Sequence, residues 1–88
     1  MREYHLDITQ AHYSGPVGVY VEHEVPRYWL EVKWRSQPDD SWQHWAPLTY
    51  HELAEAQRKR TDLQAHFEQD GHTVTIDGCD LRRVYPMA

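Results

Sequence analysis

Seven histidines in 88 residues could bind a metal or transfer protons, so their spacing is tested first. His51 and Glu55 stand four positions apart in a stretch that reads as helix, which would place them on one helix face. Zinc proteases use this spacing with two histidines, but Glu55 replaces the second one here. A zinc site needs at least three protein ligands, and His44 is the nearest third candidate. The simpler interpretation is that His51 and Glu55 are solvated residues of the first helical turn.

No serine or cysteine has the surroundings of a catalytic nucleophile. Ser14, Ser36 and Ser41 lie in predicted turns, where serine bonds to the local backbone. Cys79 is the only cysteine, and the carboxylates flanking it disfavour the reactive thiolate. We therefore predict that the protein is not an enzyme and needs no metal or cofactor.

Tryptophan and tyrosine are abundant, with four and six copies. The alternation over 28–35 places Trp29 on the face opposite Leu30 and Val32. Trp42 and Trp45 have opposite parity, so one of them is expected outside the core. An exposed aromatic patch is typical of interface hot spots. The predicted partner-binding residues are Tyr20, Glu22, Glu24, Trp29, Glu31, Trp42 and Trp45. The alternative is that a second layer of strands buries this face.

The net charge of −5 comes from 14 acidic and 9 basic residues. A protein that binds the phosphate backbone needs clustered Lys and Arg. The runs at 58–60 and 82–83 are both bracketed by acids, so we expect no direct contact with duplex DNA. An aromatic sheet face could instead stack single-stranded nucleic acid, with Lys33 and Arg35 as part of a basic rim. Net negative charge is also compatible with a basic protein surface as partner.

Local patterns predict the elements that carry these residues. Alternating apolar residues predict strands over 2–10, 17–25, 28–35 and 42–45. Thr49 and Glu52 form a capping box, and Leu48 with Leu53 a hydrophobic staple, at the start of a helix over about 50–70. Gly71 would end that helix.

A strand over 72–77 follows the helix, and Asp77-Gly78 predicts a hairpin into a last short strand over 81–85. The fold class is therefore α+β, in the order β-β-β-β-α-β-(β). An antiparallel or mixed sheet of four to six strands would carry one long helix on one face.

The length predicts a single domain over 1–88, because a chain of this size cannot bury a second core. We find no apolar run of membrane-spanning length and no signal peptide, so no membrane partner is expected. One cysteine fits a reducing compartment. These features predict a cytoplasmic protein.

Three segments together resemble a known kind of protein. They are the run from Tyr28 to Trp34 continuing to Trp42, the Leu48-Thr49 entry into the helix, and the run from Gly71 to Ile76. In general build the chain resembles small acidic proteins of phages and mobile elements, including anti-CRISPR proteins. This resemblance implies a stoichiometric inhibitor or adaptor, located in the host cytoplasm, that occludes a nucleic-acid site with acidic residues. It assigns no role to any single residue.

The leading hypothesis is a small non-enzymatic interaction protein, a phage-encoded inhibitor that binds a larger host protein or protein–nucleic-acid complex. The first alternative is a single-stranded nucleic-acid-binding module that uses the aromatic sheet face. The second is a metal-dependent enzyme or metal-binding domain on His44, His51 and Glu55. We also consider a homodimer.

Overall fold

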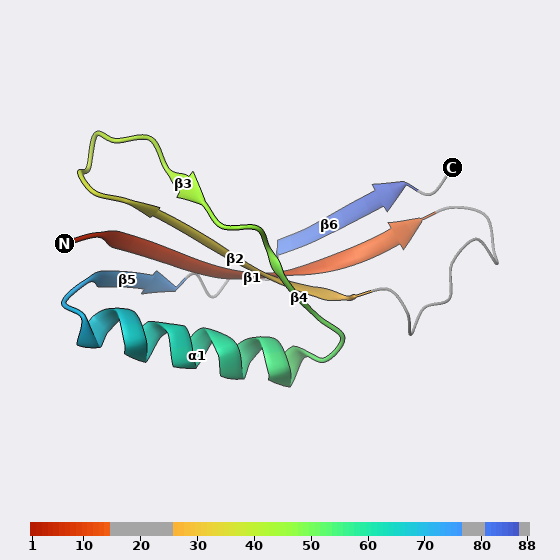
Figure 1. The fold of residues 1–88 in the computed structure, drawn as a ribbon. Coiled ribbons are helices and arrows are strands. Elements are labelled where there is room, and N and C mark those ends of the chain that lie inside the picture. Colours follow the sequence, from red (N-terminus) through yellow and green to blue (C-terminus); the bar gives the residue numbers. More distant parts are fainter. Residues whose placement is uncertain (15–25, 77–80, 87–88) are drawn as a thin grey trace.

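A mixed sheet of six strands carries one helix on one of its faces (Figure 1). The structure is a computed structural model that describes residues 1–14, 26–76 and 81–86, the segments 12–14 and 81–86 by their backbone alone. The predicted α+β fold is confirmed. The predicted strand over 17–25, with Tyr20, Glu22 and Glu24, lies outside the described residues.

Strands β1 (Glu3–Ser14) and β2 (Tyr28–Arg35) form the central antiparallel pair. Their register runs from Glu3 opposite Arg35 to Gln10 opposite Tyr28. Even-numbered residues face the core from Tyr4 to Ile8 on β1 and from Tyr28 to Trp34 on β2, as the alternation in the sequence predicts. Further along β1, the odd-numbered Thr9 and Ala11 are also buried. β1 is four residues longer at its C-terminal end than the predicted strand over 2–10.

Two short strands form the edge beside β2. Both β3 (Gln43–His44) and β4 (Leu48–Tyr50) run antiparallel to β2. Between them the backbone N–H of Trp45 donates to the carbonyl of Val32 at 3.0 Å. Pro47 has no N–H to donate, so the hydrogen-bonded ladder is interrupted there.

Two short strands also form the edge beside β1. Both β5 (Thr73–Ile76) and β6 (Leu81–Pro86) pair with β1 in parallel, one after the other along its length. A hairpin between them would reverse the chain direction, whereas both run the same way. The predicted hairpin pairing of these two strands is therefore wrong, while Asp77-Gly78 itself lies outside the described residues.

Helix α1 (Leu53–Gln69) begins later than predicted. Glu52 is its N-cap residue and makes no side-chain cap hydrogen bond. Thr49 cannot be the cap, because β4 pairs it with Trp29 across the sheet edge. Leu53 is 41% exposed and so does not form the predicted staple. The predicted end is confirmed, since the chain leaves the helix at Gly71 with a φ of +86°.

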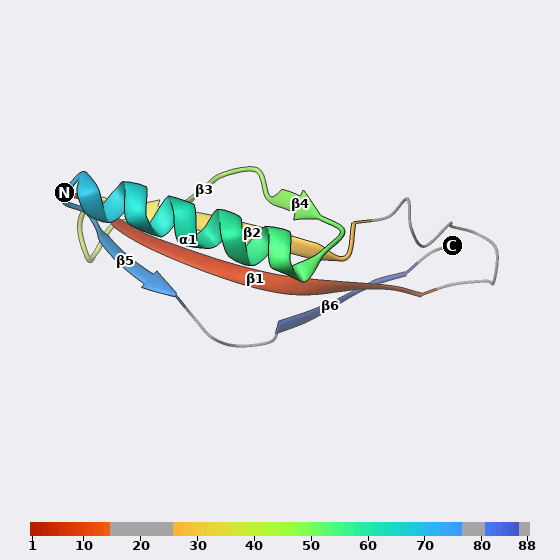
Figure 2. The ribbon, with the colours of Figure 1, turned by 90° about the horizontal axis from the view of Figure 1, so that it is seen from below.

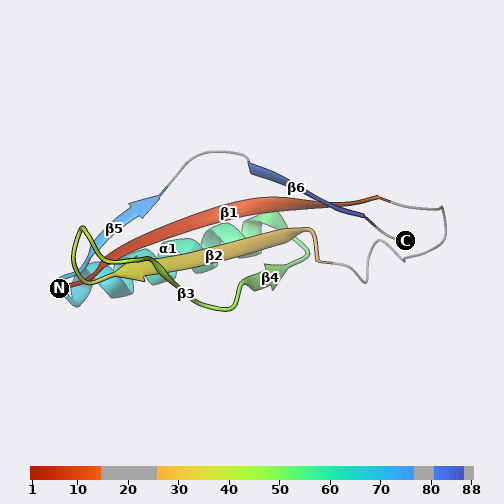
Figure 3. The same ribbon diagram turned by 90° about the horizontal axis from the view of Figure 1, so that it is seen from above.

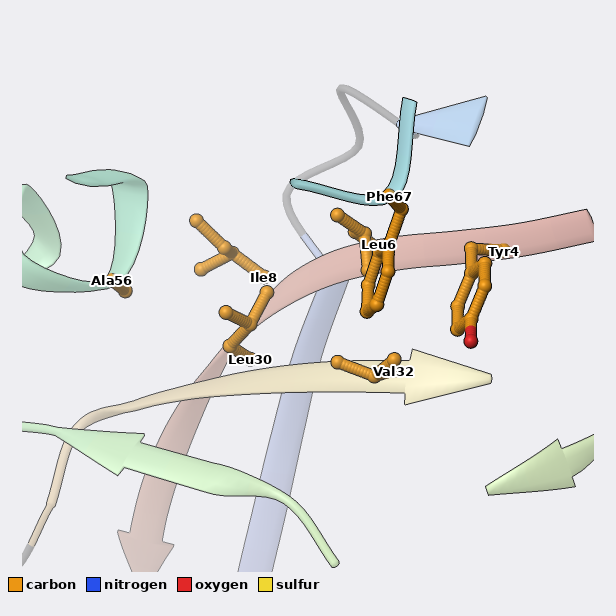
Figure 4. Close-up of a cluster of buried hydrophobic side chains, with 7 residues drawn as sticks. All are labelled: Tyr4, Leu6, Ile8, Leu30, Val32, Ala56 and Phe67. Carbon is orange, nitrogen blue, oxygen red and sulfur yellow. The ribbon is translucent and has the colours of Figure 1, made fainter. Parts of the chain in front are cut away.

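The core lies between α1 and the even-numbered face of the sheet (Figures 2 and 4). Its buried apolar residues are Tyr4, Leu6, Ile8, Leu30, Val32, Ala56 and Phe67. The predicted helix stripe supplies Ala56 and Phe67, and Leu63 packs half-buried beside them. A helix of 17 residues measures about 25 Å, whereas the 12 residues of β1 span about 40 Å. The paired ends of β1 and β6 therefore extend past the helix (Figure 1).

Candidate interaction face

The odd-numbered face of β1 and β2 points away from α1. Figure 3 looks onto it, with the helix behind the strands. We call this surface the open face and define it by nine side chains, which strand parity, register and ring contacts place together. They are Glu3, His5, Asp7, Trp29, Glu31, Lys33, Arg35, Trp42 and His44.

Trp42 lies against the cationic end of the open face. The Nζ atom of Lys33 lies 4.8 Å from its ring centroid, and the Cζ atom of Arg35 lies 4.3 Å away. The ring of His5 meets it edge-on, with 6.1 Å between centroids and 87° between planes. Cations are attracted to an indole face by its quadrupole. The turn before β3 rises on the side of the sheet away from α1 (Figure 1). The ring contacts with His5, Lys33 and Arg35 place Trp42 on this face.

Glu3 fixes the position of Arg35 at the same end. The Nε and Nη2 atoms of Arg35 donate to the two carboxylate oxygens of Glu3 at 3.0 and 3.4 Å. The two residues are cross-strand partners in the register. This two-point bond holds the guanidinium against Trp42 and offsets its charge.

Two carboxylates face each other one row further along the strands. Asp7 is directly opposite Glu31, an arrangement that is destabilising for like charges. The Oδ1 atom of Asp7 is buried and accepts no hydrogen bond from the residues that the structure describes. The Nε2 atom of His5 lies 3.6 Å from it. The two carboxylates Asp7 and Glu31 therefore lie next to the basic side chains of Lys33 and Arg35 on the same face of the sheet.

Three of the predicted partner-binding residues come together on the open face. Trp29, Glu31 and Trp42 all lie there and are half-buried. Trp45 lies on the other side of the sheet, 38% exposed, with its ring centroid 5.8 Å from that of Phe67. Trp42 and Trp45 thus occupy opposite faces, as their parity predicts.

The predicted partner-binding residues did not include Glu3, His5, Asp7, Lys33 and Arg35, although Lys33 and Arg35 were predicted as a basic rim in the nucleic-acid alternative. The parity of β2 already places Lys33 and Arg35 beside Trp29. The residues from β1 could not be found in this way, because the register between β1 and β2 joins residues with 17 or more positions between them, from Gln10 with Tyr28 to Glu3 with Arg35.

The predicted metal ligands do not form a site. His51 is exposed and precedes α1, so it does not share a helix face with Glu55. In the part of the chain that the structure describes, no group of three or more His, Cys, Asp or Glu residues is arranged to hold a metal ion.

Tyr50 has an ionisable phenol on a half-buried side chain. Burial, and then the negative charge of Glu55, raise the pKa of its phenol. Tyr50 lies on the core side of β4, half-buried, and its neutral hydroxyl form is the one that this position favours.

No family model matches the sequence, and no curated protein or solved structure matches it either. Among the described residues, no helix is both long and apolar enough to cross a membrane.

Proposed function

We propose that this chain is a small non-enzymatic interaction protein that binds a larger protein through the open face. The observation that carries the proposal is the Trp42 cluster, an aromatic ring held by Lys33, Arg35 and His5 on the sheet face that α1 leaves uncovered. Tryptophan and arginine are the residues most enriched at interface hot spots. A ring fixed in place by its neighbours loses little conformational entropy on binding.

The charge balance of the open face favours a protein partner over a nucleic acid. Within β1 and β2 this face carries three carboxylates, Glu3, Asp7 and Glu31, against the two cations Lys33 and Arg35. Nucleic-acid backbones are bound by an excess of positive charge. A protein surface with both signs of charge is the better complement.

The more specific proposal is a phage-encoded inhibitor of the anti-CRISPR type, acting on a host nucleic-acid-targeting complex in the cytoplasm. It is supported by the small acidic chain and by the sequence resemblance given above. Purified protein should co-elute with a CRISPR effector complex and should protect a targeted phage when it is expressed in the host. Failure in both assays, against a panel of effector types, would exclude the anti-CRISPR proposal. It would not affect the general proposal that the chain binds a larger protein.

A single-stranded nucleic-acid-binding module is the second candidate, because Lys33 and Arg35 beside Trp42 combine cations with a stacking surface. It predicts a salt-dependent rise in the fluorescence anisotropy of a labelled oligonucleotide at micromolar protein. No rise at low salt would rule this candidate out.

A further inference from the structure

Strand β5 forms an outer edge of the sheet, with β1 on its inner side (Figure 3). Within the part of the chain that the structure describes, no other strand pairs with it. The backbone N–H of Thr73 donates to the carbonyl of Arg2 at 3.0 Å, so Thr73 directs its backbone groups towards β1. Successive residues of a strand direct these groups to opposite sides. Those of Val74 and Ile76 therefore point away from β1 and form a template for a further strand.

The two edges of the sheet differ in how they are protected. Natural edge strands are kept very short, or carry a charged residue or a proline that discourages pairing with another chain. The edge beside β2 consists of strands of two and three residues, with Pro47 between them. Strand β5 has four residues, Thr-Val-Thr-Ile, without a charge or a proline. All four are β-branched, a type that favours strands. Strand β5 therefore lacks the protection that the other edge has.

The side chains of β5 divide between the two faces of the sheet. Val74 and Ile76 are half-buried and pack against the core, on the side of α1. Thr73 and Thr75 are exposed on the opposite side, next to Glu3 and His5 in the register. A strand that extends the sheet here must offer apolar residues on one face and polar residues on the other. The sequence of β5 itself has this pattern.

A two-fold axis perpendicular to the sheet at Thr75 pairs β5 with the same strand of a second copy, in the antiparallel direction. Val74 of each copy then lies opposite Ile76 of the other, and Thr75 lies opposite Thr75. Because Val74 and Ile76 direct their backbone groups outward, these two residue pairs exchange four N–H···O=C hydrogen bonds. The apolar pairs meet on the side of α1 and the threonine pair on the other side, both favourable cross-strand combinations. Backbone bonds, side-chain pairs and two-fold symmetry thus agree in one register.

We infer that two copies of this chain associate through their β5 edges and form one continuous sheet. The contact covers three residue pairs, less than a permanent dimer needs, so association should be reversible and should appear at high micromolar concentration. Each chain carries a net charge of −5, so the copies repel each other and added salt should strengthen the dimer. The inference goes beyond the proposed function. It is tested on purified protein alone, so its outcome does not depend on a partner.

The test substitutes Thr75, the residue that faces itself across the axis. In Thr75→Lys or Thr75→Glu alone, two like charges lie opposite each other. The dimer dissociation constant, measured by sedimentation equilibrium, should then rise about fivefold. An equimolar mixture of the two variants places opposite charges across the axis and should form heterodimers as readily as wild type dimerises. Thr61→Lys and Thr61→Glu are the matched controls, because they make the same changes on the exposed surface of α1. They should leave the constant within about twofold.

Amide hydrogen exchange locates the contact in the wild-type protein, independently of any variant. The N–H groups of Val74 and Ile76 should exchange more slowly as the protein concentration rises through the dimerisation range. The N–H of Thr75 points towards β1 and should exchange at a rate that does not depend on concentration. Far-UV circular dichroism checks that each variant is folded. Should a variant fail to fold, the exchange measurement decides alone.

Four results would overturn the inference. The first is a wild-type protein that stays monomeric up to about 1 mM, the range of non-specific encounters. The second is a mixture of T75K and T75E that remains monomeric where wild type dimerises. The third is an equal loss of association in the Thr61 variants, which would assign the effect to overall charge. The fourth is dimerisation that leaves the exchange of Val74 and Ile76 unchanged, which would place the contact elsewhere.

Discussion

The ring of Phe67 lies flat against the ring of Tyr4, with centroids 3.8 Å apart and 6° between the planes. Tyr4 belongs to the start of β1 and Phe67 to the end of α1, so the contact fastens the helix to the first strand (Figure 4). Both side chains are buried. The pair closes the core at the end where β1 begins and α1 ends.

Replacing Phe67 should therefore lower the free energy of unfolding more than replacing other apolar residues of α1. We expect Phe67→Ala to cost about 3–5 kcal/mol, a large share of the stability of a small domain. Phe67→Leu keeps an apolar side chain but loses the stacking, and should cost about 1 kcal/mol. Urea denaturation measures both. Leu53→Ala, at an exposed position, is the control and should cost less than about 0.5 kcal/mol.

Tyr50 should make stability fall at alkaline pH. Burial and Glu55 raise the pKa of Tyr50 in the folded chain, whereas the unfolded chain titrates at about 10. The folded state thus holds the phenol proton to higher pH than the unfolded state. Its contribution to stability is complete below pH about 10 and is lost as the pH rises through the folded-state pKa. Unfolding free energies measured from neutral to alkaline pH should decline less in Tyr50→Phe than in wild type. Equal declines would contradict this assignment.

Gly71 should resist substitution for a backbone reason alone. Its φ of +86° is a conformation that residues with a Cβ rarely adopt, while a Cβ there would meet no atom within 4 Å. Gly71→Ala is expected to cost about 1 kcal/mol, and Gly71→Asn less, since asparagine tolerates this region better. Thermal unfolding of the two variants would show this order. Equal loss in both would point to a side-chain clash instead.

Trp42 and Trp45 provide a matched pair for locating the partner surface. Trp42→Ala removes the ring from the open face, and hot-spot residues of this type contribute about 2–4 kcal/mol to binding. Trp45→Ala removes a ring from the other side, where it contacts Phe67. We expect the first variant to lose the partner in pull-down from the native host, and the second to lose stability while retaining the partner. The opposite result would place the interface on the helix side.

The sequence predicted correctly those helices and strands whose pattern of apolar residues matches the side that is buried in the fold. The alternation from Tyr28 to Trp34 identified the central strand and its two faces, and the Ala56 and Phe67 stripe identified the buried side of α1. The capping prediction failed because Leu48 and Tyr50 pair with β2 and pack half-buried on the core. Thr49 lies between them, and this pairing overrode a good local cap signal.

For the candidate site, the sequence predicted which residues of a single strand share a face, but not which residues of the neighbouring strand join them. Parity placed Trp29, Glu31 and Lys33 together, but Asp7 and His5 join them through strand register, which no local pattern encodes. The hairpin prediction at Asp77-Gly78 failed for a related reason. Its dipeptide is a strong turn signal, yet β5 and β6 both gain their hydrogen bonds from β1.

The pairing of β1 with β5 and β6 has a kinetic consequence. The backbone N–H of Arg2 donates to His72 at 2.9 Å across 70 positions of the chain, and the residues that follow pair over similar separations. Closing such a long loop costs entropy before any contact compensates for it. Sheets built from distant pairings fold slowly compared with helical proteins of equal length. During synthesis, β1 and β2 emerge long before β5 and β6, so the outer edge of β1 stays open to other chains until the last described strands arrive. Folding yield should therefore depend on protein concentration during expression, more than the final stability would suggest.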